Sequence, residues 1–164
     1  MRTAERRTGQ STRTRGTSQV ARRTLVLGLF ALFGCLNAMG CSSSRAQECT
    51  KLITVLNKNA ESVKAATSKI NAADANAASF NEAAASMEAA ADDIGTVPIK
   101  DDELTKIAGD YREMLRSGAK AVRDLGKARD DNDVPGIDKA SGELATVDST
   151  EPVIVERIKK YCSQ

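Results

Sequence analysis

The chain has little of what catalytic sites are usually built from. Its 164 residues include no histidine and no tryptophan, and aromatic residues make up only 3%. Without histidine, the usual general base, the serine–histidine nucleophile pair and imidazole metal ligands are excluded. The Glu-x-x-His motif of di-iron bundles and the CxxCH haem-attachment motif are excluded for the same reason. We therefore expect no catalytic residues, no metal and no cofactor, in a protein that is not an enzyme.

The basic charge of the chain is confined to its N-terminal part. The formal net charge is +2, but residues 1–40 hold seven arginines and a single acidic residue, Glu5. The rest of the chain carries 17 basic and 21 acidic residues. Because this larger part is slightly acidic, the net charge gives no reason to expect nucleic-acid binding.

The first forty residues have the order of an export signal. An arginine-rich segment ends at Arg22 and Arg23, and an apolar stretch follows from residue 25 to residue 36. A membrane-spanning helix needs about 20 apolar residues, so we interpret residues 1–40 as a cleaved signal peptide, with an uncleaved anchor as the alternative. The sequence ARRTLVL also resembles the twin-arginine export motif, which leaves the general and twin-arginine routes both open.

Two cysteines near the end of this segment compete as lipid attachment sites. The sequence LFGC ends at Cys35 and AMGC ends at Cys41, and each has a glycine before the cysteine. Both resemble the lipobox of bacterial lipoproteins, a resemblance that covers the signal alone. It implies that the cysteine is diacylated and becomes the first residue of the mature chain. Phe33 departs from the pattern in the first site, as Ala38 and Met39 do in the second.

The number of cysteines favours Cys41 over Cys35. An exported protein resides where thiols oxidise, and an odd cysteine would be left without a partner. Cleavage before Cys41 leaves Cys49 and Cys162 as a single disulfide pair, whereas cleavage before Cys35 leaves three cysteines. In lipoproteins of this kind, Asp after the lipidated Cys marks retention in the inner membrane. Ser42 occupies that place, so the resemblance implies the outer membrane, facing the periplasm.

Beyond residue 48 the apolar residues recur at spacings of three and four, which predicts α-helices throughout. Breaks are expected at NAADANAASFNE, GTVPIKDD and RDDNDVPG. Ser79 and Glu82 have the spacing of a capping box in the first break, while Asp101 and Asp133 are the expected caps of the last two helices.

Proline at position 152 falls inside the last expected helix. A proline there removes one backbone hydrogen bond and clashes with the preceding turn, at a cost of roughly 3 kcal/mol. We therefore expect a kink or a short break between Asp148 and Glu151.

The expected fold is all-α, an up-down four-helix bundle closed by a disulfide between the start of helix 1 and the end of helix 4. The periodicity alone also allows one long helix from about 47 to 95. In the four-helix topology Cys49 and Cys162 lie at the same end of the bundle. A disulfide between them therefore requires four helices rather than one long first helix. The predicted organisation is a signal peptide over residues 1–40, a lipid-anchored tether over 41–47 and a helical bundle over 48–164.

A row of basic residues follows one face of the third expected helix. Since their spacing places them opposite its apolar face, they are a candidate binding stripe for anionic head groups or wall polymers, with a solvated face as the alternative. The members of this cationic row are Arg112, Arg116, Lys120, Arg123 and Lys127.

These features predict a protein of the bacterial cell envelope, anchored to the membrane through its N-terminal lipid. The expected role is a non-catalytic structural or binding module whose partner is an envelope protein or a wall polymer. The alternative is a periplasmic carrier or inhibitor that binds a peptide or a small apolar ligand between its helices. The oligomeric state and the biological process are left open.

Overall fold

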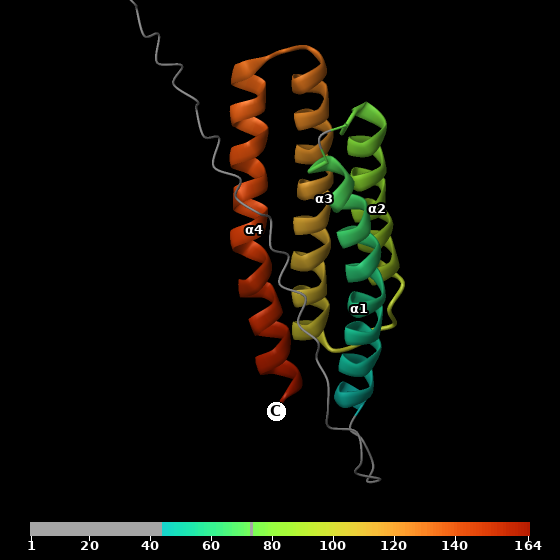
Figure 1. Cartoon of the computed structure of the whole chain (residues 1–164). Helices are drawn as coiled ribbons and strands as arrows, with labels where there is room; N and C mark the ends of the chain where they lie inside the picture. Colours follow the sequence, from blue (N-terminus) through green and yellow to red (C-terminus); the bar gives the residue numbers. More distant parts are fainter. Residues whose placement is uncertain (1–43, 73) are drawn as a thin grey trace, which may run out of the picture.

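Four α-helices run alternately up and down in a computed structural model of the chain (Figure 1). The structure describes residues 44–72 and 74–164, and no strand occurs among them. The helices are α1 (Ser44–Ile70), α2 (Ala77–Gly95), α3 (Asp102–Asp130) and α4 (Val134–Cys162). The predicted all-α four-helix bundle is therefore confirmed. The predicted signal peptide and both candidate lipidation sites, Cys35 and Cys41, lie outside the described residues.

Helix α1 begins earlier than its predicted boundary. Its first residue is Ser44, inside the 41–47 segment predicted to be a tether, so residues 44–47 form the first helical turn. The first turn carries Arg45, whose guanidinium lies over the ring of Tyr161 at 5.2 Å from the centroid. This contact with α4 favours an ordered first turn.

Helix α1 ends at Ile70 and α2 begins at Ala77, which confirms two helices rather than one long helix. The expected capping box is wrong, because α2 begins at Ala77. The cap is Asn76, whose side-chain oxygen accepts hydrogen bonds from the backbone N–H groups of Ala78 and Ser79 at 3.0 and 3.3 Å. Ser79 is thus already helical and cannot act as the cap.

The caps of the two C-terminal helices fall at the expected residues. The Asp101 side chain accepts a hydrogen bond from the Leu104 N–H at 2.9 Å, which confirms it as the cap of α3. Asp133 occupies the N-cap position of α4 but makes no side-chain cap bond. The tight α3–α4 turn places Asn132 at a φ of 53°, a left-handed conformation that asparagine tolerates better than most residues.

Helix α4 continues through Pro152, so the predicted break between Asp148 and Glu151 does not occur. Pro152 and Asp148 both lie on the exposed part of the helix surface. The carbonyl of Asp148, which would accept a bond from an N–H at position 152, can therefore bond to water instead.

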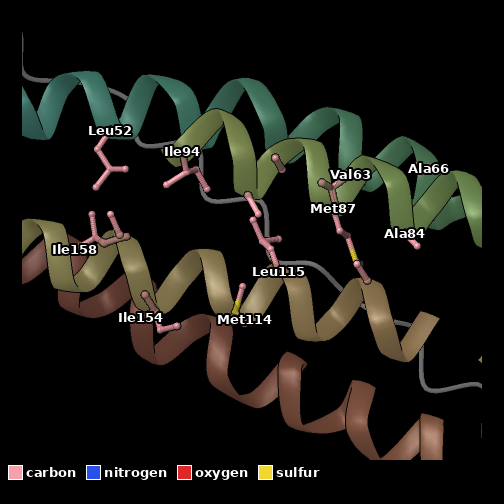
Figure 2. Packing of buried hydrophobic residues seen from close by; sticks show 14 of the residues in the cluster. Leu52, Val63, Ala66, Ala84, Met87, Ile94, Met114, Leu115, Ile154 and Ile158 are labelled. Carbon is pink, nitrogen blue, oxygen red and sulfur yellow. The ribbon is translucent and has the colours of Figure 1, made fainter. Parts of the chain in front are cut away.

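The core is built mainly around α2 and α3, from small side chains and a few large ones (Figure 2). Ala83, Ala84 and Ala91 of α2 are completely buried. At Gly126 of α3, an added Cβ would come within 2.7 Å of the Cβ of Phe80, so this close approach of α2 to α3 requires glycine. The largest fully buried side chains are Leu52, Ile94, Leu104, Ile107 and Val122.

The helices pack in chain order, α1 on α2, α2 on α3 and α3 on α4, while α1 and α4 have little direct contact. The Cys49–Cys162 disulfide joins these two outer helices, with an S–S distance of 2.07 Å and a Cα–Cα distance of 5.8 Å. It links the start of α1 to the end of α4, as predicted from the cysteine positions. Cys49 is only 3% exposed.

Reduction of this disulfide should destabilise the bundle strongly. The cysteines are 113 residues apart, and closing a loop of about 100 residues is worth roughly 4.7 kcal/mol in the chain-entropy model. For a domain of this size we expect the melting temperature to fall by about 15 °C or more. Thermal melts followed by circular dichroism, with and without reductant, measure the difference. A reduced protein melting within about 2 °C of the oxidised one would contradict the expectation.

Candidate functional site

A polar cluster surrounds the disulfide at the end of the bundle where α1 starts. Glu48, next to Cys49, is only 7% exposed. Its Oε2 accepts hydrogen bonds from the backbone N–H groups of Lys100 and Asp101 at 3.0 and 3.1 Å. This carboxylate therefore fastens the α2–α3 connection to the first turns of α1.

The same cluster extends to the last turn of α4. The Tyr161 hydroxyl donates a hydrogen bond of 2.6 Å to Asp101 Oδ2, while Asp101 Oδ1 caps α3. The bonds from Tyr161 and from the Leu104 N–H hold the pKa of Asp101 below its ordinary value. Side chains from α1, from the N-cap of α3 and from α4 thus meet at the disulfide-linked end.

The cationic row predicted on α3 is not a set of free charges. Arg123 pairs with Glu88 of α2, and Arg116 lies 2.9 Å from Asp92 of the same helix. Arg112 donates a hydrogen bond of 3.0 Å to the backbone carbonyl of Ala91. These three arginines border α2, so for them the expected position opposite the apolar face of α3 is wrong.

The two lysines of the row pair with carboxylates four residues further along the chain, Lys120 with Asp124 in α3 and Lys127 with Asp131 at its C-cap. In the described structure every member of the cationic row therefore has a carboxylate or carbonyl partner. This pairing leaves little charge for an anionic surface, and binding of anions by the row stays a prediction.

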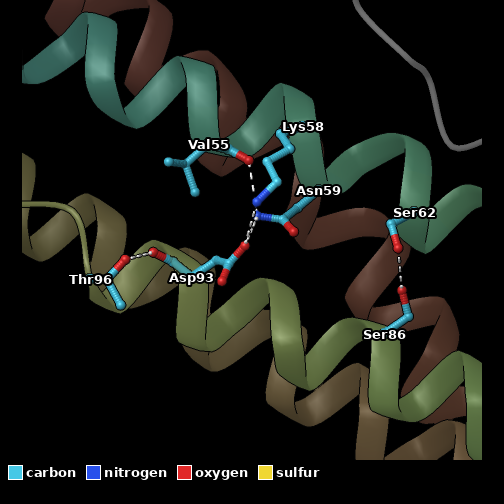
Figure 3. A network of polar contacts seen from close by, with 7 residues as sticks. All are labelled: Val55, Lys58, Asn59, Ser62, Ser86, Asp93 and Thr96. Carbon is cyan, nitrogen blue, oxygen red and sulfur yellow. Dashed lines mark hydrogen bonds and ion pairs between the residues drawn. The ribbon is translucent and has the colours of Figure 1, made fainter.

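Helix α1 is attached to α2 by a polar network along one edge (Figure 3). Asp93 of α2 accepts from Asn59 Nδ2 at 3.3 Å and lies 3.4 Å from Lys58 Nζ. One turn further along, the hydroxyls of Ser62 and Ser86 are 3.2 Å apart. These contacts fix the side of α1 that faces α2, so its opposite side is directed away from α2.

Glu151 is a residue of interest that the sequence pattern did not single out. It lies in the inward row of α4, between Val147 and Ile154, at spacings of four and three. The apolar side chains on this side of α4 leave a gap of seven residues between Val147 and Ile154, and that gap is the signal in the sequence. A carboxylate thus occupies a position that the helix periodicity assigns to the core.

The environment of Glu151 favours its protonated form. Burial raises the pKa of Glu151, and the neighbouring carboxylate of Asp148 raises it further, against the lowering effect of a hydrogen bond from Tyr111. That bond, from the Tyr111 hydroxyl to Glu151 Oε1, is 3.3 Å long. Burial also raises the pKa of the Tyr111 hydroxyl. Partial desolvation raises the pKa of the Asp148 carboxyl.

Glu151 differs from the other carboxylates that lie between helices. Glu88 has Arg123 as a partner, and Asp110 lies 2.6 Å from Arg157. For Glu151 the described part of the chain supplies a phenol but no cation within ion-pair distance. Chemically, this position is suited to accept a hydrogen bond or an ion pair from a cationic group.

Replacing Glu48 by alanine should destabilise the disulfide-linked end. The Lys100 and Asp101 N–H groups would lose their acceptor, and a lost buried acceptor costs about 1–3 kcal/mol. Glu48→Gln is the matched control, because its amide oxygen can accept both bonds. Urea unfolding of the two variants at pH 7 measures the free energies. Equal stability of Glu48→Ala and wild type would mean that these bonds contribute nothing.

Glu151→Gln should stabilise the protein at pH 7. The folded state raises the pKa of this carboxyl from 4.5, so the folded chain binds more protons than the unfolded chain. Its contribution to stability is therefore present at low pH and lost as the pH rises through the raised pKa. Glutamine stays neutral and still accepts the bond from Tyr111.

Melting temperatures at pH 4 and pH 7 test this prediction. We expect the variant to exceed wild type by a few degrees at pH 7 and the difference to shrink at pH 4. Glu156→Gln, on the exposed side of the same helix, is the matched control and should change stability by less than about 0.5 kcal/mol. A less stable Glu151→Gln variant at pH 7 would show that the ionised carboxylate stabilises the fold.

Two features are absent from the described residues. Over residues 44–72 and 74–164, no helix is both long enough and apolar enough to cross a membrane. No group of three or more acidic or cysteine side chains in these residues is arranged to hold a metal ion. No family model, curated protein or solved structure matches the chain.

Proposed function

We propose that this chain is an exported lipoprotein of the bacterial cell envelope whose helical bundle acts as a non-catalytic binding module. The observation that carries the proposal is the disulfide between Cys49 and Cys162. Structural disulfides persist in oxidising compartments such as the periplasm and are rare in the cytosol. The export signal and the lipobox-like sequence before Cys41 agree with that location.

The start of α1 supports attachment through Cys41. Only Ser42 and Ser43 separate this cysteine from the first helical residue, Ser44. A lipid on Cys41 would therefore hold the disulfide-linked end of the bundle close to the bilayer. The 29 residues of α3 correspond to about 43 Å at 1.5 Å per residue, so the opposite end would extend that far from the membrane.

The proposed location, on the outer membrane facing the periplasm, depends on the resemblance to lipoproteins. The proposed role as a binding module depends on the arrangement of the helices. A partner from the envelope, either a protein or a wall polymer, would approach the long sides of the bundle. The alternative, a carrier for a peptide or a small apolar ligand, is favoured by one observation, the slight contact between α1 and α4.

The intact mass of the protein extracted from membranes tests the anchor and the export together. We expect a diacylated chain that begins at Cys41, with two thiols that react with an alkylating agent only after reduction. Cys41→Ser should lose the lipid mass and membrane attachment, while the matched Cys35→Ser should keep both. A mature chain beginning at Cys35, an uncleaved N-terminus, or free thiols at Cys49 and Cys162 would overturn the proposal.

A further inference from the structure

The disulfide identifies the sides of α1 and α4 that face each other. Leu56 lies seven residues after Cys49 and therefore on the same side of α1. Val155 and Asp148 precede Cys162 by seven and fourteen residues, so they share its side of α4. In Figure 1, α3 lies between α4 and the pair formed by α1 and α2.

We call the strip between these two sides the α1–α4 seam, and its residues are half-buried, except for the exposed Asp148. Its apolar members are partly exposed, although they stand on the inward sides of their helices. Little direct contact between α1 and α4 covers them. The residues that define the seam are Leu56, Tyr111, Leu144, Asp148, Glu151 and Val155.

Negative charge is concentrated at the middle of this apolar strip. Asp148 and Glu151 are one helical turn apart on α4, and no cation in the described chain pairs with either. The nearest basic residue along α4, Arg157, is engaged by Asp110 and Glu103. Among the described residues, the middle of the strip at Asp148 and Glu151 therefore has slight cover from α1 and no ion-pair partner.

We propose that the α1–α4 seam binds an amphipathic helix of another envelope protein, whose apolar face carries a lysine or arginine that pairs with Glu151. Helices recognise such strips through apolar residues at spacings of three and four. A cation on that helix supplies the ion pair that Glu151 lacks, and apolar neighbours cover Leu56, Leu144 and Val155. This inference deepens the proposed function, since it names the class of partner for the binding module.

A second copy of the chain fits the seam less well than a basic helix. A symmetric contact between two seams would bring the Asp148 and Glu151 carboxylates of both copies to one interface. Like charges in a partly desolvated interface cost free energy and disfavour that arrangement. Charge complementarity thus selects a basic partner.

Two synthetic peptides of about 20 residues, long enough to span about 30 Å as a helix, serve as probes. Both have a face of leucine and alanine and are fluorescently labelled. One carries a single lysine at the centre of that face, and the other carries glutamine there. The full acylated chain is assayed by fluorescence anisotropy in phosphatidylcholine nanodiscs, with empty nanodiscs as the blank, at pH 7.

We expect wild type to bind the lysine peptide about tenfold more tightly than the glutamine peptide, as one charge-assisted hydrogen bond provides. Glu151→Gln should reduce this preference to less than about threefold, while the matched Glu156→Gln should keep it. Circular dichroism of both variants verifies that they are folded. This comparison isolates the contact between Glu151 and the lysine from general attraction by the acidic bundle.

Equal affinity of wild type for the two peptides, or an equal loss in both variants, would overturn the inference. So would the absence of binding at 1 mM peptide, about the weakest affinity that specific recognition provides, or a stable dimer that hides the seam. A chain that lacks the lipid is assayed in buffer instead. Failure of the anchor, seen in the intact mass, is thereby distinguished from failure of the seam.

Discussion

The disulfide between Cys49 and Cys162 is the constraint on which the arrangement of the outer helices depends. Since α1 packs on α2 and α4 packs on α3, no extensive helix–helix surface joins the first and last helices. The covalent bond therefore supplies the closure that side-chain packing supplies in an ordinary four-helix bundle. Glu48 and Tyr161 strengthen the same end by hydrogen bonds to the α2–α3 connection and to Asp101. The bundle is fixed at this end, and α1 and α4 share little contact along the rest of their lengths.

The alanine content of α2 explains the close packing of α2 against α3. Alanine lets helices approach closely but buries little apolar area, and buried area is what stabilises a core. The fully buried Ala83 and Ala84, together with Gly126, bring α2 and α3 together. The direct contact between α1 and α4 is slight, and Leu56 and Leu144 on these two helices are only partly buried.

The fold could be predicted to a large extent from the sequence, because its main signals are local. Spacings of three and four give the helices, and the two terminal cysteines exclude a single long first helix. The missed features depend on neighbours that are distant in sequence. Arg123 and Arg116 of α3 pair with Glu88 and Asp92 of α2, and these partners are not contained in the pattern of α3 alone. The solvent exposure of Pro152, which likewise depends on the neighbouring helices, allows α4 to continue through this residue.

The two glutamates in core-facing positions, Glu48 and Glu151, differ in how the fold satisfies their carboxylates. Glu48 is the more deeply buried, but two backbone N–H groups satisfy it and connect two parts of the fold. Glu151 has one phenolic donor, and the nearby Asp148 makes its ionised form less favourable. A carboxylate placed between helices without a cation is a local inconsistency of the kind that marks functional sites, and it is the reason for proposing a binding role for Glu151. A cation from a bound helix would reverse the sign of this contribution, because it stabilises the ionised carboxylate that the free bundle disfavours.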